Sequence, residues 1–400
     1  MRRSTCTNVI MRSKLMPLST RSKRRKIETR QVLHAISVGP AGFGMPFSVR
    51  FYWHRRQLHC RVLLHPLMKT PVVMAVTCLI ASPLFAQAPS GGSSAESPRQ
   101  AAPARRASAQ KPEAYSASVP KPTFSAVPYG EHERQILDFW QADSSGPAPV
   151  AFVIHGGGWV GGSKERVDRF VDVNALLKAG VSVVAINYRL IRRDSSADTT
   201  PPVKAPLHDA ARALQFVRSK AAEWNIDKSR IGAAGGSAGA CSSLWLAFHE
   251  DLSAPNSEDP VARESTRLSC AAVTGPQTTL DPQQMQEWTP NSTYGGHAFG
   301  LGSFQEFLAA REKILPLIAE YSPYALVSSD DPAVYMIFNA APAIGQPQKD
   351  PTHTANFGVK LAEHCMTKNV SAEVVYPGAP DVKHPTPTDF LIAHLKPVSK

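Results

Sequence analysis

Acidic residues are almost absent from the first 67 positions of this 400-residue sequence. That stretch holds fourteen Lys and Arg residues and a single acid, Glu28. Residues 68–400 hold 30 basic and 31 acidic side chains, so the formal charge of +12 comes from the N-terminal stretch alone. A basic folded body would indicate a nucleic-acid or anionic-membrane partner. Because this body is near neutral, we predict that the protein binds no nucleic acid.

Cysteine and metal-binding patterns are also scarce. The sequence has six cysteines, of which only Cys241, Cys270 and Cys365 follow residue 88. Three cysteines allow one disulfide at most, so no disulfide framework is expected. The thirteen histidines show neither H-x-H nor H-E-x-x-H spacing, and no P-loop Lys-Ser/Thr follows a glycine-rich segment. We therefore predict a protein without metal or cofactor.

No hydrophobic run is long enough to span a bilayer as a helix, which takes about twenty residues. The longest runs from Pro71 to Phe85, after Met68-Lys69-Thr70 and before Ala86-Gln87-Ala88. A short basic region, an apolar segment and an A-x-A site are typical of a secretory signal peptide. We predict a signal peptide at 68–88, a periplasmic or secreted protein, and no stable membrane anchor after cleavage.

The segments around this signal peptide carry little sign of a fold. Because signal peptides begin a chain, we predict that translation starts at Met68 and that residues 1–67 are a mis-assigned extension. A basic hexamer at 21–26 leaves a nuclear or nucleic-acid signal as the alternative interpretation. Residues 89–122 are rich in Ala, Pro and Ser without hydrophobic periodicity, which predicts a disordered linker. One catalytic domain is then expected over 123–400.

From residue 136 onward, short apolar runs alternate with longer segments of helical periodicity. Such alternation predicts βαβ units, with a mostly parallel central sheet and helices on both faces. Ligands of these sheets bind beyond the carboxyl ends of the strands. The expected strands are 136–140, 150–155, 181–188, 230–234, 270–273, 334–338 and 372–376. The expected helices are 166–178, 205–224, 238–249, 357–365 and 390–395.

The segment Gly235-Gly236-Ser237-Ala238-Gly239 lies between an expected strand and an expected helix. It matches G-x-S-x-G, the nucleophile elbow, in which glycines leave room for a strained turn that projects the serine hydroxyl above the sheet. The turn also directs the backbone N–H of Ala238 toward the reacting carbonyl. The motif alone also fits a glycine-rich turn with a capping serine. Its strand–turn–helix context favours Ser237 as a nucleophile.

A second glycine-rich segment, His155-Gly156-Gly157-Gly158-Trp159, follows the expected strand 150–155. Consecutive glycines let the backbone approach a substrate and direct N–H groups into a site. We predict that Gly157 and Gly158 form an oxyanion hole together with Ala238. His155 is expected to steady this loop by hydrogen bonding and not to act as a catalytic base.

With these two motifs, the chain resembles the α/β-hydrolase superfamily, and within it esterases of the hormone-sensitive-lipase and bacterial feruloyl-esterase-like type. The resemblance covers about residues 130–395 and extends to Asn187-Tyr188-Arg189 and Asp209. It departs from the lipase group at Gly236, where an acid is usual, and at Ala240, where a further glycine is common. It implies the α/β-hydrolase fold and a carboxylesterase that removes acetyl or feruloyl groups from polysaccharide.

A serine nucleophile needs a base that is oriented by a carboxylate, and in this fold the chain order is serine, acid, histidine. Asp350 is the only carboxylate between Pro332 and Leu361, so it is the predicted acid. His384 is the only histidine in the loop after the last expected strand and is the predicted base. His353 is the alternative base, and Asp381 is the alternative acid.

Residues 276–327 contain irregular helical material, for which we predict a lid insertion over the active site. Four aromatic residues are candidates to line a substrate pocket: Trp159, Trp288, Tyr294 and Phe299. For the aromatic residues of the insertion, packing within the insertion is the favoured interpretation. The predicted protein is an exported serine hydrolase that acts on a small-molecule or polysaccharide-linked ester. An amidase of the formamidase or peptidase kind, or an inactive α/β-hydrolase used as a binding module, remains the alternative.

Overall fold

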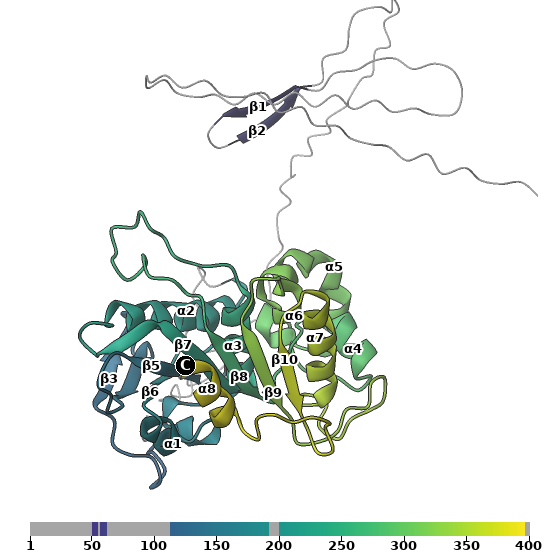
Figure 1. The fold of residues 1–400 in the computed structure, drawn as a ribbon. Helices are drawn as coiled ribbons and strands as arrows, with labels where there is room; N and C mark the ends of the chain where they lie inside the picture. Colours follow the sequence, from purple (N-terminus) through teal and green to yellow (C-terminus); the bar gives the residue numbers. More distant parts are fainter. Residues whose placement is uncertain (1–49, 55–56, 62–112, 192–199, 397–400) are drawn as a thin grey trace, which may run out of the picture. The chain divides into compact units, whose positions relative to one another are not determined.

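The computed structural model describes residues 50–54, 57–61, 113–191 and 200–396 (Figure 1). The chain forms two units, Met1–Pro103 and Ala104–Lys400. In the first unit, β1 (Arg50–His54) and β2 (Gln57–Arg61) pair as an antiparallel hairpin. The predicted signal peptide at 68–88 lies outside the described residues, as do most of the predicted extension 1–67 and residues 89–112 of the predicted linker.

The second unit contains an eight-stranded sheet in the order β10-β9-β8-β7-β5-β6-β4-β3. The six strands from β10 to β6 in this order pair in parallel, whereas β4 is antiparallel to both β6 and β3. This arrangement confirms the predicted α/β-hydrolase fold with a mostly parallel sheet. The strands are β3 (Phe124–Pro128), β4 (Ile136–Trp140), β5 (Ala148–Ile154), β6 (Ser182–Ile186), β7 (Ile226–Gly236), β8 (Cys270–Thr274), β9 (Ala333–Ile337) and β10 (Ala372–Val375).

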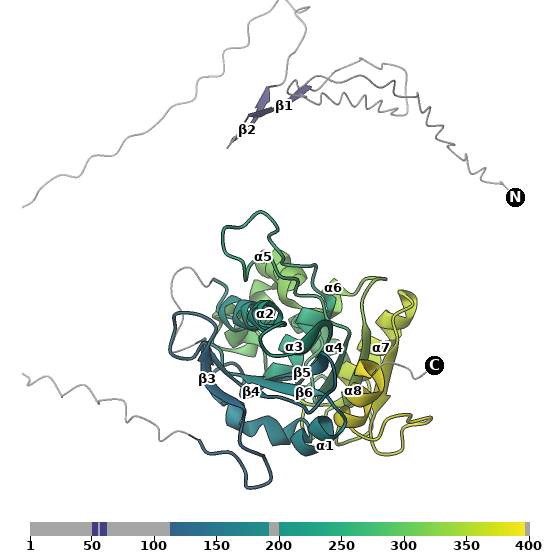
Figure 2. The ribbon, with the colours of Figure 1, turned by 60° about the vertical axis from the view of Figure 1, so that its left-hand side comes forward.

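Helices cover both faces of the sheet. One face carries the 3₁₀ helix η1 (Lys164–Arg169), α1 (Val173–Lys178) and α8 (Pro387–Leu395). The other carries α2 (Lys204–Ser219), α3 (Ala238–Phe248) and α7 (Ala355–Thr367). Figure 2 shows α1 and α8 on the opposite side of the strands from α2 and α3. Strands buried on both faces read as continuous apolar runs, as β5 and β6 do.

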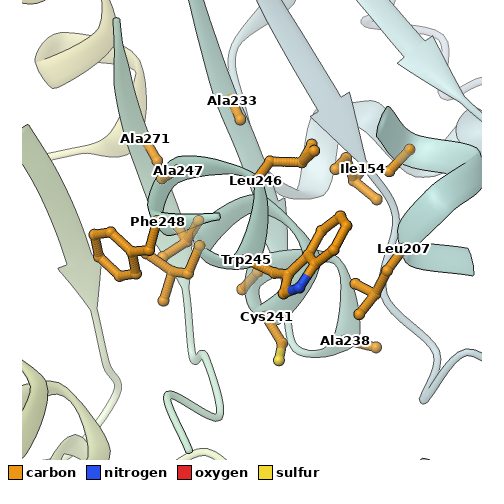
Figure 3. Close-up of a cluster of buried hydrophobic side chains, with 14 of the residues drawn as sticks. Ile154, Leu207, Ala233, Ala238, Cys241, Trp245, Leu246, Ala247, Phe248 and Ala271 are labelled. Carbon is orange, nitrogen blue, oxygen red and sulfur yellow. The ribbon is translucent and has the colours of Figure 1, made fainter. Parts of the chain in front are cut away.

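Helix α3 lies in the centre of the larger hydrophobic core, and every one of its residues is buried. Figure 3 shows Trp245 and Leu246 of α3 packed among side chains from the neighbouring strands and α2, including Ile154 and Leu207. The indole N–H of Trp245 donates to the carbonyl oxygen of Glu320 at 3.0 Å, so its polar atom is satisfied inside the core. This packing fixes the helix whose first turn follows Ser237.

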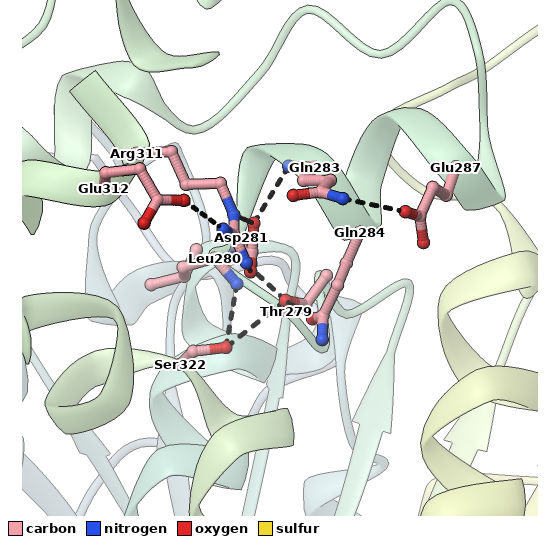
Figure 4. Close-up of polar contacts among 9 residues, drawn as sticks. All are labelled: Thr279, Leu280, Asp281, Gln283, Gln284, Glu287, Arg311, Glu312 and Ser322. Carbon is pink, nitrogen blue, oxygen red and sulfur yellow. Dashed lines mark hydrogen bonds and ion pairs between the residues drawn. The ribbon is translucent and has the colours of Figure 1, made fainter. Parts of the chain in front are cut away.

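The segment between β8 and β9 is helical, within the range predicted as an insertion. It contains α4 (Pro282–Trp288), η3 (Gly296–Phe299), α5 (Phe304–Tyr321) and α6 (Pro323–Leu326). Asp281 caps α4 and forms an ion pair of 2.7 Å with Arg311 of α5, while the hydroxyl of Ser322 accepts from the N–H of Leu280 (Figure 4). These contacts join the start of α4 to the middle of α5, through Arg311, and to the residue after the end of α5, Ser322.

Two predictions about local structure are wrong. The single helix predicted at 166–178 is divided into η1 and α1 by Phe170, Val171 and Asp172, of which Asp172 caps α1 with its side chain. Residues 113–122, predicted as the end of a linker, pack on the domain. The hydroxyl of Tyr115 donates to Asp138 at 2.5 Å, and the Trp140 indole donates to the carbonyl oxygen of Pro120 at 2.7 Å.

The three cysteines of the domain, Cys241, Cys270 and Cys365, are all free and buried, so the structure contains no disulfide among them. Burial raises the pKa of the Cys270 and Cys365 thiols to about 12. Thiols with such a raised pKa stay protonated at neutral pH and are poor nucleophiles. Among the described residues, no helix combines the length and the apolar character that a membrane span requires.

Candidate active site

Ser237 occupies a sharp turn between β7 and α3, with φ of 53° and ψ of −120°. A positive φ is costly for a residue with a side chain, so this turn is strained. A Cβ atom at Gly235 or Gly239 would overlap the carbonyl oxygen of Ile154 in β5. The two flanking glycines are therefore required by the close approach of β5, and this is the physical reason for the G-x-S-x-G spacing.

A neighbouring aromatic ring accounts for the lack of a side chain at position 236. A Cβ atom built on Gly236 would overlap the ring of Phe170, the first residue after η1. The ring thus occupies the space into which a side chain at position 236 would extend. Where related lipases usually carry an acid at this position, this chain places a phenylalanine from another element beside the nucleophile.

A histidine and a carboxylate are connected to Ser237 through two successive hydrogen bonds. The Nε2 atom of His353 lies 2.9 Å from the Oγ atom of Ser237, and its Nδ1 atom lies 2.9 Å from Oδ2 of Asp350. In this geometry the serine hydroxyl donates to Nε2, and the Nδ1–H group donates to the carboxylate. Serine, histidine and aspartate in this order form the arrangement of a Ser-His-Asp triad.

The prediction of His384 as the base is wrong. His384 lies in the loop after β10, where its Nδ1 atom is 2.7 Å from Oε2 of Glu373. The backbone N–H groups of Lys383 and His384 both donate to the other carboxylate oxygen of Glu373. Because these bonds turn the 381–384 loop toward the edge strand β10, His384 does not line the cavity around Ser237. Asp381, the alternative acid, is likewise exposed outside that cavity.

The acid and the base lie in one loop because a tight turn joins them. Oδ1 of Asp350 accepts the backbone N–H groups of Thr352 and His353, both at 3.2 Å, while Oδ2 accepts from the His353 ring. Although partial burial acts in the opposite direction, the hydrogen bonds from His353 and Thr352 hold the pKa of Asp350 below its usual value. The D-x-x-H spacing was the available sequence signal, since an aspartate commonly hydrogen-bonds the backbone two residues ahead.

The loop with Asp350 and His353 is tied to the helical insertion. The amide of Asn356 donates to the carbonyl oxygens of Trp288 and Ala343 at 2.7 and 3.0 Å, and its Oδ1 atom accepts from the N–H of Ala343 at 2.7 Å. Asn291 and Gln348 form a further pair of hydrogen bonds, both at 2.9 Å. The insertion therefore supports the loop that carries the acid and the base.

The loop after β5 contains the two glycines that are predicted to form an oxyanion hole. Gly157, Gly158 and Trp159 have φ values of 112°, 61° and 57°. Across the described residues, no hydrogen bond occupies the N–H group of Gly157 or Gly158. Ala238 is the first residue of α3, so its N–H group has no partner within the helix. Of the two glycines, Gly157 lines the cavity at Ser237 and Gly158 borders a separate cavity, and their role as an oxyanion hole stays a prediction.

His155 holds this loop in place. Its Nδ1–H group donates to the carbonyl oxygen of Gly156 at 2.7 Å, and its ring stacks on Tyr188 at 4.2 Å between centroids. Burial lowers the pKa of His155 to about 3, so the ring is neutral at physiological pH. A buried neutral imidazole in these contacts has a structural role, as expected. Arg189 and Asp209, two residues to which the resemblance extends, form an ion pair of 2.6 Å.

A cavity of about 480 Å³ adjoins Ser237. Its lining comes from the loop after β5, from η1 and the residue after it, from the turn at Ser237, from the end of β8, and from the end of β9 with the loop that follows. The residues are Gly156, Gly157, Arg166, Arg169, Phe170, Gly236, Ser237, Thr274, Gly275, Ile337, Phe338, Asn339, Asp350 and His353. No residue of the helical insertion from α4 to α6 is among them, so the insertion does not cover this cavity as a lid.

The four aromatic residues predicted to line the pocket lie elsewhere. Trp159 is fully buried and donates from its indole N–H to Ser242 at 3.0 Å. Trp288 packs on Tyr324 and Phe357, and Phe299 stacks on Phe307. Trp159 and Trp288 are buried in the core and Phe299 packs against it, which for Trp288 and Phe299 agrees with the favoured interpretation of packing. The sequence pattern missed Arg166, Arg169 and Phe170, because they belong to a segment predicted as an ordinary surface helix.

Tyr294 lines a separate cavity of about 300 Å³, which Gly158 also borders. The Nε2 atom of His297, in the same cavity, is 3.1 Å from the carbonyl oxygen of Gly158. The helical insertion thus contacts the loop after β5 through His297 and Gly158. Its part in the site is to support the loop and not to form the wall of the cavity at Ser237.

Comparison with known proteins then identifies the family. The family model described as BD-FAE matches residues 137–346, slightly more than half of the chain, including the loop after β5 and Ser237. The chain belongs to the BD-FAE family. This match confirms the predicted resemblance to hormone-sensitive-lipase-like and feruloyl-esterase-like α/β-hydrolases. It ends before Asp350 and His353, so the acid and the base rest on the geometry alone.

Curated relatives of this BD-FAE chain are named as ester hydrolases. It is 38% identical over 117 residues to the "Probable carboxylic ester hydrolase LipM" of Mycobacterium tuberculosis, covering 28% of this chain and 25% of that protein. It is 33% identical over 102 residues to the versiconal hemiacetal acetate esterase of Dothistroma septosporum, covering 26% and 29%. The chain thus spans less than a third of the length of the curated relatives it matches.

Among solved structures, the BD-FAE chain is similar to an acetyl ester-xyloside bifunctional hydrolase from Caldicellulosiruptor lactoaceticus. The TM-score is 0.48 and the identity 23%, over 65% of this chain and 87% of that one. A truncated carbohydrate esterase from gut microbiota gives a TM-score of 0.49 at 18% identity, over 66% and 90%.

Proposed function

We propose that this protein is a serine hydrolase that cleaves carboxylic esters through an acyl-enzyme. The observation that carries the proposal is the continuous contact from Ser237 Oγ to His353 Nε2 and from His353 Nδ1 to Asp350 Oδ2, each at 2.9 Å. A free serine hydroxyl is a weak nucleophile, and a hydrogen-bonded imidazole beside it supplies the base that it lacks. Membership of the BD-FAE family and the names of the curated relatives support an ester as the substrate.

Each residue has a defined part in the reaction. Ser237 Oγ attacks the ester carbonyl while His353 Nε2 takes its proton, and Asp350 fixes the histidine tautomer and stabilises the imidazolium. The N–H groups of Gly157, Gly158 and Ala238 bind the oxygen that becomes negatively charged in the tetrahedral intermediate. His353 then protonates the departing alcohol oxygen. Water, activated by the same histidine, attacks the acyl-enzyme and releases the acid.

The substrates that we propose are acetyl or feruloyl esters carried by polysaccharide. The cavity beside Ser237 is bordered by solvent-exposed residues such as Arg169 and Asp350, which would admit an ester group that projects from a larger molecule. We also propose export, directed by the predicted signal peptide at 68–88, with no stable membrane anchor afterwards. N-terminal sequencing of the natively expressed protein tests this, because a mature chain that begins well before Pro89 would contradict it.

The activity is tested with 4-nitrophenyl acetate and with acetylated, feruloylated and formamide substrates. Wild-type protein should release 4-nitrophenol, and Ser237→Ala should reduce kcat by about a thousand-fold or more. Equal turnover by the wild type and by Ser237→Ala would refute the nucleophile. Faster cleavage of the formamide than of every ester would indicate an amidase. No turnover of any substrate by the folded wild type would indicate a binding module.

A further inference from the structure

The cavity beside Ser237 has an excess of positive charge. Among its lining residues, two side chains are cationic, Arg166 and Arg169, and one is anionic, Asp350. The carboxylate of Asp350 is already occupied, because Oδ2 accepts from the His353 ring and Oδ1 accepts from backbone N–H groups. The two guanidinium groups therefore carry the positive charge of this cavity, and one of them, that of Arg166, is paired with Glu113.

Both arginines come from η1, which is fixed to the domain at its other end. The ammonium group of Lys164 is buried and lies 2.9 Å from Oδ2 of Asp138 in β4. The hydroxyl of Tyr115 binds the same carboxylate at 2.5 Å, and the N–H of Lys164 donates to the side chain of Asn187. Although η1 is kinked at Arg166, both Arg166 and Arg169 line the cavity, so an anchored element carries the two cations.

Among the described residues, most N–H donors of the Arg166 and Arg169 guanidinium groups have no hydrogen-bond acceptor. Arg166 donates from Nε to both carboxylate oxygens of Glu113, at 2.8 and 2.9 Å. Within the described part of the chain, its terminal amino groups make no hydrogen bond, and the Arg169 guanidinium makes neither a hydrogen bond nor an ion pair. A guanidinium group presents parallel N–H donors at the spacing of the two oxygens of a carboxylate.

We propose that the site selects esters that carry a carboxylate close to the scissile bond. Arg169 and the terminal amino groups of Arg166 bind this carboxylate while the ester carbonyl lies at Ser237. The inference rests on the proposed ester hydrolysis and adds its substrate class, an anionic ester. Glu113 occupies the Nε side of Arg166 and so leaves Arg169 as the less neutralised of the two cations.

The test compares two pairs of esters that differ in charge. Mono(4-nitrophenyl) adipate and 4-nitrophenyl hexanoate place the charge on the acyl side, whereas 3-acetoxybenzoate and its methyl ester place it on the alcohol side. The measured quantity is the ratio of kcat/KM for the anionic ester to kcat/KM for its neutral partner, because this ratio cancels any general loss of activity. Wild-type protein should favour the anionic member of at least one pair, and that pair shows on which side of the ester the arginines act.

Arg169→Gln should lower this ratio about ten-fold, the scale of a charge-assisted hydrogen bond at a partly exposed site. Arg263→Gln is the matched control, because Arg263 does not line the cavity and its removal changes the net charge equally. Glu113→Gln should raise the ratio, since it releases the Nε side of Arg166. The wild-type preference should also fall as ionic strength rises.

The proposal is overturned if the wild type favours the neutral ester in both pairs, or if Arg169→Gln and Arg263→Gln change the ratio equally. A lower ratio in Glu113→Gln would contradict the part assigned to Arg166. Failure of ester hydrolysis itself would look different, because neutral esters would then be cleaved no faster by the wild type than by Ser237→Ala. Ser237-dependent cleavage of neutral esters without an effect of Arg169 would refute the anionic subsite alone.

Discussion

Asp350 and His353 lie three residues apart in one loop, and the Oδ2 atom of the first is 2.9 Å from the Nδ1 atom of the second. The same loop places the opposite ring nitrogen 2.9 Å from Ser237, which is 116 positions earlier in the chain. One segment, from Asp350 to His353, thus supplies both partners of the nucleophile. A second histidine–carboxylate pair, Glu373 and His384, lies at the edge strand β10.

The assignment of the base is tested by a matched pair of variants. His353→Asn should reduce kcat on 4-nitrophenyl acetate by about a thousand-fold or more, because the serine hydroxyl loses its proton acceptor. His384→Asn should keep kcat within roughly two-fold of the wild type, since its ring binds Glu373 outside the cavity. Steady-state kinetics on both purified variants decides between them. The opposite ranking would restore His384 as the base.

The elbow glycines should differ in their tolerance of alanine. Gly239→Ala brings a methyl group into the backbone oxygens of Ile154 and His155, which cannot move aside, and should cost about 3 kcal/mol or more of unfolding free energy. The atoms nearest to the methyl group of Gly236→Ala belong to the ring of Phe170, a half-exposed side chain that can rotate, so this variant should cost less than about 1.5 kcal/mol. Urea denaturation of both variants measures the difference. Equal losses would show that the ring of Phe170 is as rigid as the backbone.

Asn356 should be essential to the loop that carries the acid and the base. Asn356→Leu keeps a similar volume but removes the hydrogen bonds of a buried amide to Trp288, Thr289 and Ala343, which should cost about 2–4 kcal/mol. It should also lower kcat, because the loop with Asp350 and His353 loses one of its connections to the insertion. Unfolding curves and kinetics at a temperature where both proteins are folded measure the two effects.

The control for this variant is Asn174→Leu, which removes a single hydrogen bond from an exposed asparagine to the carbonyl oxygen of Ser118. It should cost less than about 1 kcal/mol and leave the kinetics unchanged. If Asn356→Leu matched this control in both measurements, the network would not support the active-site loop.

The Glu373–His384 pair should contribute a pH-dependent part of the stability. Partial burial raises the pKa of Glu373, but the hydrogen bonds from His384 and Lys383 prevail and lower it below its usual value. A carboxyl group whose pKa is lowered by folding stabilises the protein above its unfolded pKa, and this contribution is lost as pH falls through the folded pKa. Glu373→Gln should therefore cost about 1 kcal/mol at pH 7 and almost nothing near pH 3.

Thermal denaturation of the wild type and of Glu373→Gln between pH 3 and 7 measures this difference. Glu363→Gln serves as the control, because Glu363 forms an exposed ion pair with Lys360. Its effect should stay small over the whole range. A cost of Glu373→Gln that grew toward acid pH would have the wrong sign for this pair.

The sequence by itself determined the features that depend on neighbouring residues. The alternation of apolar runs and helical periodicity was enough for the fold class, because strands buried on both faces leave a continuous apolar pattern. The elbow at Ser237 and the loop at Gly157 and Gly158 were also accessible, since the close approach of β5 to the elbow and the positive φ values of the loop demand glycine at fixed positions.

The tertiary structure decided which distant groups meet Ser237. His353 and His384 are both histidines in loops after strands, and only the hydrogen bonds of Asp350 and Glu373 determine which ring turns toward the nucleophile. The sequence pattern around Arg169 predicted one surface helix. The structure divides this segment into η1 and α1 and places Arg169 in the wall of the cavity beside Ser237. Side-chain partners far apart in the chain are selected by the packing of whole elements, and local sequence patterns do not record that packing.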